Sequence, residues 1–214
     1  MEEKQSEKFD ILNGWELLLA SASPRRRELV GNLCLTCELA EPRDVDEAYP
    51  GSMRPEEVPA YLSRKKAHAY LSSLRHNQIL LTADTVVINR GEVVGKPRDL
   101  SDAASMLRRL SGHSHKVVTG VTLATVRSQH TFAEETEVEF ARLTDREIAY
   151  YVDNFHPLDK AGAYGIQEWI GYIGVSGIRG DFYNVMGLPL RALYENLLKI
   201  TARPPVKMPL DHIG

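Results

Sequence analysis

Residues 15–27 read Trp-Glu-Leu-Leu-Leu-Ala-Ser-Ala-Ser-Pro-Arg-Arg-Arg. The apolar start of this stretch, residues 15–20, predicts a short strand. Ser23 is a residue type favoured at helix N-caps, and Pro24 suits the first helical position. A helix is therefore predicted to begin here and to run to about Leu33. A strand that leads directly into a helix is the basic unit of an α/β protein.

The rest of the chain alternates in the same way. Apolar spacing and capping signals predict helices over residues 55–74, from a cap at Ser101 or Asp102 to 110, over 144–154 and over 188–200. Strands are predicted over residues 79–88, 92–94, 115–125 and 131–140, with a turn at 89–91. Residues 41–54 are predicted to form a loop, and the glycine-rich residues 162–180 to be irregular or to form short strands. The pattern predicts an α/β fold with a mixed sheet.

The chain has 214 residues, which favours one domain of two lobes over two very small domains. Residues 1–14 are expected to be a loose leader, residues 15–200 the folded domain and residues 201–214 a proline-rich, loosely held tail. The polar start resembles neither a signal peptide nor a transit peptide, so the expected compartment is the cytoplasm.

Composition limits the classes of partner. The formal net charge is −3, which argues against a protein that coats nucleic acid, because such binding needs many Lys and Arg contacts to phosphates. No run approaches the roughly 20 apolar residues of a membrane-spanning helix. A small phosphorylated ligand remains compatible with this charge, since it needs only a local basic cluster.

Cys34 and Cys37 form the sequence's one Cys-x-x-Cys pair. Half a zinc site or a redox pair would use this spacing. No second cysteine pair or suitably spaced histidine follows, and the pair lies in an apolar run rather than at a helix start that would lower a thiol pKa. Two small, partly buried residues beside a strand are the favoured interpretation.

The first site candidate is the corner between the strand and the helix. Arg25, Arg26 and Arg27 lie in the predicted first turn, where positive charge opposes the helix dipole. A helix N-terminus attracts anions, and arginine binds phosphate through paired contacts, so a phosphate chain would resolve the conflict. Surface salt bridges would account for any one of these arginines, but are less favoured for all three. The chain contains no Walker P-loop.

The second candidate is Asp84, which interrupts the apolar residues 79–88. A carboxylate in a buried strand is costly unless it is paired, hydrogen-bonded or bound to a metal. A turn residue at a strand break and a metal ligand or general base are about equally favoured.

Lys66, Lys96 and Lys160 are weaker candidates, because an isolated lysine is usually a solvated surface charge. Glycines around Gln167 suggest a close backbone approach to a ligand.

The residues match, in order, six motifs of the Maf family, also called septum-formation-like proteins, which are nucleoside triphosphate pyrophosphatases. The matching segments are Leu17–Leu29, Leu81–Val87, Gly95–Pro97, Leu110–Val121, Asp159–Gln167 and Tyr183–Leu190. The resemblance covers about residues 15–200. It implies an elongated α/β fold of two lobes with a central cleft, similar to that of inosine triphosphate pyrophosphatases.

The resemblance also implies roles for residues. Asp84 falls on the family's catalytic proton acceptor, and Glu47 on an acidic position that looks like its partner in binding a divalent metal, Mg²⁺ or Mn²⁺. The polar and basic lining of the phosphate site matches Ser23, Arg25, Arg26, Lys66 and Lys96.

Three positions bear on the substrate. Members with an aromatic residue after Ser-Pro resemble enzymes of 7-methyl-GTP, in which the aromatic ring could stack on a charged purine. Arg25, Thr85 and Gln167 instead resemble the dTTP/UTP type, and an amide such as Gln167 can donate to and accept from a pyrimidine edge. Two departures stand out: residues 155–157 differ from the common Gly-Glu-Pro, and Glu168-Trp169 replaces small residues, a change that could alter how the base is held.

Other functions remain open at this stage. A nucleotide-binding regulator of division that hydrolyses nothing would use the same arginines, and a pyrophosphatase for modified nucleotides, of the inosine triphosphate type, is the nearest enzymatic rival. An RNA-binding module is disfavoured by the net charge and by the lack of a basic, aromatic-rich sheet signature. A homodimer is compatible with the sequence.

Overall fold

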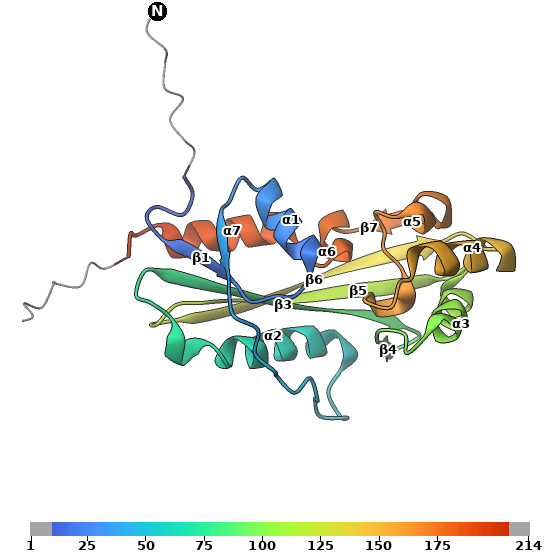
Figure 1. Cartoon of the computed structure of the whole chain (residues 1–214), viewed down its shortest axis with the longest axis horizontal. Coiled ribbons are helices and arrows are strands. Elements are labelled where there is room, and N and C mark those ends of the chain that lie inside the picture. Colours follow the sequence, from blue (N-terminus) through green and yellow to red (C-terminus); the bar gives the residue numbers. More distant parts are fainter. Residues whose placement is uncertain (1–9, 206–214) are drawn as a thin grey trace, which may run out of the picture.

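The computed structural model describes residues 10–205 and has an elongated shape (Figure 1). A mixed sheet has the strand order β2-β1-β3-β5-β6-β7, and β4 pairs with β3. The strands are β1 Glu16–Leu19, β2 Cys37–Leu39, β3 Gln78–Asn89, β4 Glu92–Val94, β5 Ser114–Ala124, β6 Gln129–Phe140 and β7 Val175–Arg179. The α-helices are α1 Pro24–Asn32, α2 Val58–His68, α3 Leu100–Leu110, α4 Asp145–Phe155, α5 Trp169–Gly174, α6 Phe182–Met186 and α7 Leu190–Thr201. The predicted mixed α/β fold is confirmed.

The sheet changes direction at β3. Strand β1 is parallel to both β2 and β3, whereas β3, β5, β6 and β7 pair antiparallel in succession. Side chains alternate between the two faces of a strand. In β3, Ile79 and Leu81 pack with α1 and α7, whereas Leu80 and Ile88 belong to the apolar clusters under α2. Helices on both faces explain why almost all of β3 is buried.

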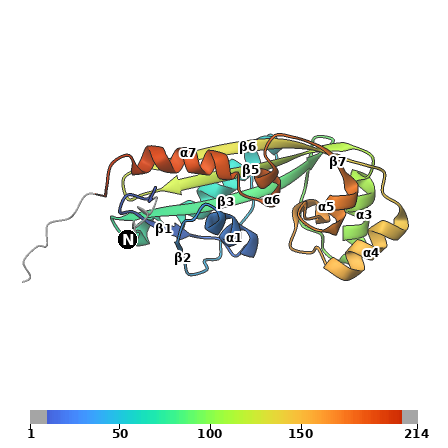
Figure 2. The same ribbon diagram turned by 90° about the horizontal axis from the view of Figure 1, so that it is seen from above.

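Strands β3 and β5 run through both lobes of the molecule (Figure 2). In the first lobe, α1, α2 and α7 cover the sheet. In the second, α3, α4 and α5 pack around a separate apolar core that includes Val87 of β3 and Val117 of β5. The expected two-lobed arrangement is therefore built on strands that both lobes share.

The corner after β1 forms as the sequence predicts. Ser23 has extended backbone angles, Pro24 occupies the first helical position, and the helix ends at Asn32. The Ser23 side chain makes no capping hydrogen bond, so it is free to face the space in front of the helix. The predicted capping box at Thr144 and Glu147 is also present at the start of α4.

Helix α2 lies unusually close to the sheet at Gly120 of β5. A Cβ atom at this position would lie 2.2 Å from the backbone nitrogen of Ala60. Gly120 is the register partner of Asp84 in β3. The missing side chain therefore lets α2 approach the sheet next to Asp84.

Four sequence predictions need correction. Residues 55–74 do not form one helix: a 3₁₀ turn at Pro55–Glu57 precedes α2, which ends at His68 before a second 3₁₀ turn. The cap of α3 is Asp99, not Ser101 or Asp102, because the Asp99 carboxylate accepts from the Asp102 backbone N–H. Residues 162–180 contain helix α5 as well as β7, and β3 continues without a break through Asp84.

The remaining predictions concern the ends and the cysteines. Residues 1–9 and 206–214 lie outside the described residues, so the predicted loose leader and tail fall largely there. Ile11 and Leu12 were predicted to belong to the leader, but they are buried in the apolar core of the first lobe, together with residues of α1 and α7. Cys34 and Cys37 are both free, and burial raises the pKa of the Cys37 thiol. Within residues 10–205, no helix has the length and apolar content needed to cross a membrane.

Candidate active site

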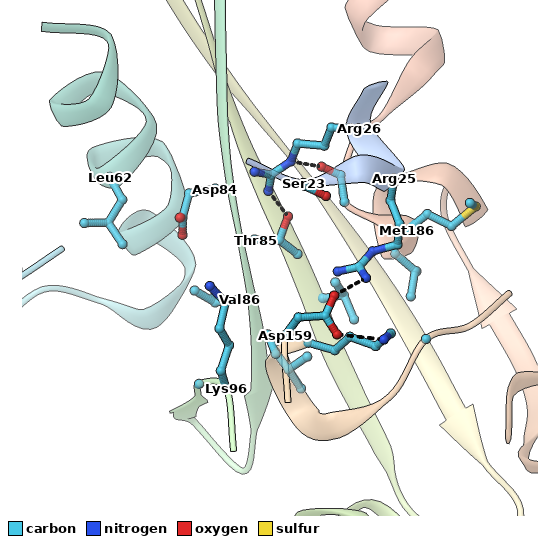
Figure 3. Close-up of a pocket in the computed structure, with 18 of the residues that line it drawn as sticks. Ser23, Arg25, Arg26, Leu62, Asp84, Thr85, Val86, Lys96, Asp159 and Met186 are labelled. Atoms are coloured by element: carbon cyan, nitrogen blue, oxygen red, sulfur yellow. Dashed lines mark hydrogen bonds and ion pairs between the residues drawn. The ribbon is translucent and has the colours of Figure 1, made fainter. Parts of the chain in front are cut away.

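A cleft lies where the two lobes meet on the sheet (Figure 3). It has two compartments, with volumes of about 470 and 630 Å³. The residues that line both compartments are all polar or charged: Ser23, Arg25, Arg26, Glu47, Lys66, Lys96 and Asp159. All eight residues predicted for the substrate or catalytic site line the first compartment, as does Glu47: Ser23, Arg25, Arg26, Lys66, Asp84, Thr85, Lys96 and Gln167.

The two predicted acidic residues meet at one cation. The Lys66 ammonium lies 2.5 Å from Asp84 Oδ1 and 2.8 Å from Glu47 Oε1. Asp84 is 9% exposed, and β3 directs its side chain toward α2, which supplies Lys66. The hydrogen bond from Lys66 lowers the pKa of Glu47 against the opposing effect of burial, and the charges of Lys96 and Arg26 add to the lowering. Both carboxylates thus face a position that favours positive charge.

Glu47 and Asp84 could supply some, but not all, of the ligands of a divalent metal. Mg²⁺ takes oxygen ligands and often binds through one or two carboxylates together with substrate phosphates. Glu47 and Asp84 converge on one point, so they could hold such an ion. Among residues 10–205 there is no group of three or more histidine, cysteine or acidic side chains around one point. The remaining ligands would therefore come from phosphate oxygens and water.

Arg26 is held by protein acceptors. Its Nε donates to the Gly187 carbonyl at 2.9 Å, Nη1 to the Ala83 carbonyl at 2.9 Å, and Nη2 to the Thr85 hydroxyl at 3.1 Å. Burial lowers the pKa of Arg26, and the nearby Asp84 opposes this effect. Arg26 contributes positive charge to the cleft, but most of its donors tie α1 to β3 and to the turn before α7.

Replacing Arg26 with lysine is expected to lower the free energy of unfolding by about 2 kcal/mol, because a single ammonium leaves buried acceptors unpaired. Urea denaturation would measure the change. Arg27→Lys is the matched control, since Arg27 is the exposed neighbour in the same turn, and it should stay within about 0.5 kcal/mol of the unmodified protein. Equal stability of the two variants would contradict the structural role of Arg26.

The Thr85 hydroxyl extends this network across the sheet. It lies 2.9 Å from the hydroxyl of Thr119, which itself donates to the Asn184 carbonyl. The single hydroxyl proton of Thr119 is therefore used, and Thr85 must donate to Thr119 while it accepts from Arg26. Thr85 lines the cleft, but in this arrangement it has no further proton to donate to a ligand.

Arg25 crosses the cleft. Its Nη1 lies 2.6 Å from Asp159 Oδ2, on the loop that follows α4 (Figure 3). Arg25 and Arg26 thus leave the same helical turn in different directions, one across the opening and one into the protein. Burial alone would raise the pKa of Asp159, but the hydrogen bonds and the positive charges of Lys160 and Arg25 together lower it.

The first compartment also has an apolar side, formed by Val58, Leu62, Val86, Val117 and Met186 among others. Gln167 lines this compartment, and its side-chain oxygen is buried with no hydrogen-bond partner among the described residues. A buried acceptor without a partner is uncommon in folded proteins. The first compartment thus combines an apolar side with a charged wall, an arrangement that could hold a ligand with a flat apolar part and an anionic part.

The sequence did not identify every residue of the site. Asp159 was not singled out. Lys160 was a weak candidate, for which a solvated surface charge was the favoured interpretation, but it is only 8% exposed and is paired with Asp159 and Glu168. The signal was present in the adjacent acidic and basic residues that precede a glycine-rich run. The partner of Asp159 across the cleft is Arg25 of α1, which lies far away in the sequence, so the local pattern could not reveal it.

Comparisons with known proteins show the family to which the sequence is related. The family model described as Maf-like protein matches residues 16–200. A protein from Bacteroides thetaiotaomicron named dTTP/UTP pyrophosphatase is 50% identical over 189 residues, which are 88% of this chain and 98% of that protein. A protein of the same name from Christiangramia forsetii is 42% identical over 188 residues, covering 88% of this chain and 95% of that protein.

Among solved structures, a nucleoside-triphosphatase / dITP/XTP pyrophosphatase from Mycobacterium abscessus matches with a TM-score of 0.41 and 16% identity, covering 87% of this chain and 97% of that one. A HAM1 protein from Coxiella burnetii matches with a TM-score of 0.45 and 16% identity, covering 86% of this chain and 99% of that one.

Proposed function

The chain belongs to the Maf-like protein family, and on that premise we propose that it hydrolyses dTTP and UTP to the nucleoside monophosphate and pyrophosphate. The observation that carries the proposal is the charged wall shared by the two compartments, with Asp84 and Glu47 at Lys66 and the apolar pocket beside them. Relatives named dTTP/UTP pyrophosphatase, close to half identical over most of their length, support the same substrates.

The proposed orientation follows from the lining. The base enters the apolar side of the first compartment, where the Gln167 amide can pair with the edge of a pyrimidine. The phosphate chain lies along the wall that carries Arg25, Lys66 and Lys96. Asp84 lines the first compartment and contacts Lys66 of this wall, and in the proposed orientation its carboxylate lies next to the α-phosphate.

In the proposed reaction, a water molecule attacks the α-phosphorus and the bond between this phosphorus and the α–β bridging oxygen breaks. Asp84 accepts the proton from the water, and pyrophosphate departs with the electron pair of the broken bond. Lys66, Lys96 and Arg25 neutralise the charge that grows on the leaving group. Lys66 must then turn from the carboxylates toward the phosphates.

A divalent metal is part of the proposal. Glu47 and Asp84 would hold it, and when bound it would neutralise phosphate charge and help to orient the water. With Lys66 displaced toward the phosphates, the two carboxylates would otherwise face each other across a negatively charged ligand, which is electrostatically unfavourable.

The test is a panel of dTTP, UTP, CTP, the purine triphosphates, inosine triphosphate and 7-methyl-GTP, assayed for pyrophosphate and for the monophosphate. Addition of Mg²⁺ or Mn²⁺ to chelator-treated protein is expected to restore turnover, with dTTP and UTP preferred. Preference for inosine triphosphate or another modified nucleotide would favour the alternative of a modified-nucleotide enzyme. Binding without pyrophosphate release would favour a non-hydrolysing regulator.

A further inference from the structure

A chain of polar contacts leads from Arg25, on the charged wall along which the phosphates are proposed to lie, to the turn that carries Gln167. Arg25 pairs with Asp159, and Asp159 lies 2.7 Å from the Lys160 ammonium. The same ammonium lies 3.1 Å from Glu168 Oε1. The side chain of Lys160 is only 9% exposed, so its charge depends on these two carboxylates for compensation.

Glu168 fixes the turn through both its backbone and its side chain. Its backbone N–H donates to the Gly165 carbonyl at 3.0 Å, which closes the turn over residues 165–168. The Tyr151 hydroxyl donates to the second carboxylate oxygen of Glu168 and accepts from the Gly165 N–H at 3.1 Å. The Glu168 carboxylate also packs against Gly165, where a Cβ atom would lie 2.8 Å from Glu168 Cδ.

The turn places Gln167 at the cleft. The Gln167 carbonyl accepts from the Tyr172 hydroxyl at 2.6 Å, so its backbone is held on both sides. Its side-chain oxygen is buried and has no partner among the described residues. Gln167 lines the first compartment, whereas Glu168 does not. Glu168 can therefore affect a ligand only through the residues that it holds.

We propose that Glu168 is a positioning residue for base recognition: together with Lys160 and Tyr151, it holds the turn over residues 165–168 so that the Gln167 amide faces the pyrimidine. This inference rests on the proposed function and deepens it.

The carboxylate of Glu168 matters because both of its side-chain partners, Lys160 and Tyr151, present donors to it. Burial, followed by the hydrogen bond to Glu168, raises the pKa of Tyr151, so the phenol stays protonated and can donate. Glu168→Gln would keep one side-chain oxygen as an acceptor. The second oxygen would be replaced by an NH₂ group, which would face the donor of either Lys160 or Tyr151. Loss of the carboxylate would therefore loosen the turn, and Gln167 with it, while leaving the contact between Asp84 and Lys66, which lies outside this chain of residues, in place.

The experiment compares Glu168→Ala, Glu168→Gln and Tyr151→Phe with the unmodified protein on dTTP and dATP. Glu168→Ala is expected to raise KM for dTTP about tenfold, the size of one well-placed hydrogen bond, with kcat changed less than twofold. The ratio of kcat/KM for dTTP over dATP should fall by a similar factor. Glu168→Gln and Tyr151→Phe should shift this ratio in the same direction.

Glu137→Ala is the matched control, because Glu137 also forms an ion pair, with Arg179, but lies outside the cleft. It should leave the ratio unchanged. The inference is overturned if Glu168→Ala keeps the dTTP preference, or if it lowers kcat for both nucleotides equally along with the melting temperature.

A binding measurement separates this inference from the proposed function. Failure of the unmodified protein to release pyrophosphate from any triphosphate would refute the proposed function alone. The rise in melting temperature caused by dTMP, compared with that caused by dAMP, would still report base recognition. A dTMP-specific rise that Glu168→Ala removes supports the positioning role, and one that persists in the variant contradicts it.

Discussion

Replacement of Asp84 by asparagine is expected to reduce kcat for dTTP by about 100- to 10,000-fold, the usual contribution of a general base. Asparagine has the same shape but cannot accept the proton from the attacking water, and it is a weaker ligand for a divalent metal. The fold should persist, because Lys66 keeps its contact with Glu47, 2.8 Å away. Pyrophosphate release in a steady-state assay and the melting temperature would be measured on the same preparation.

Asp102→Asn is the matched control for this variant. The Asp102 side chain is 16% exposed and pairs with one basic residue, Arg98, whereas the Asp84 side chain is 13% exposed and pairs with Lys66. Asp102 lies on α3, outside the cleft. It should therefore show normal turnover. Undiminished kcat in Asp84→Asn would rule out the assigned role.

Replacement of Gly120 by alanine is expected to cost about 3 kcal/mol or more of the free energy of unfolding, at the upper end of the range for overpacking. The added Cβ would lie 2.2 Å from the Ala60 nitrogen and 2.3 Å from the Pro59 carbonyl carbon. Backbone cannot rotate out of the way as a flexible side chain can. Relief requires α2 to move away from β5, which would also draw Lys66 away from Asp84.

Urea denaturation and a dTTP assay would test both consequences. Gly31→Ala is the control, because Gly31 lies in helix α1 and a Cβ there would have no neighbour within 4 Å. Its stability should be unchanged or raised by up to about 1 kcal/mol, since alanine favours the helix. A Gly120→Ala protein as stable as Gly31→Ala would show that α2 is not held against the sheet at this point.

Local signals in the sequence were sufficient for much of the fold. Ser23 with Pro24, and Thr144 with Glu147, mark helix starts by residue types that are close together in the sequence. The structure confirms both starts, although only the second pair forms capping hydrogen bonds. The ends of the helix within residues 55–74 could not be predicted, because the apolar spacing continues beyond α2 into the two flanking 3₁₀ turns. Asp99 was missed as a cap because the neighbouring residues are equally good caps in isolation.

The site shows a similar division. Asp84 stood out because a carboxylate in an apolar strand needs a partner, but the sequence could not show that Lys66 is that partner. Their contact depends on α2 lying close to Gly120, which is a tertiary feature. Likewise, Arg25 and Arg26 are equivalent in the sequence. Only the positions of Gly187 and Asp159 decide that one is bonded to the protein and the other spans the cleft.

Strands β3 and β5 pair residue by residue from Leu80 to Ile88, through the middle of the molecule and under the cleft. A flexible linker between two lobes would permit a hinge, but a continuous hydrogen-bonded ladder resists bending there. Adjustment to an incoming nucleotide is thus expected in the loops at the rim, residues 41–54 and 156–160, rather than by one half swinging toward the other. Hydrogen exchange should accordingly change in these loops on nucleotide binding and remain slow in both strands.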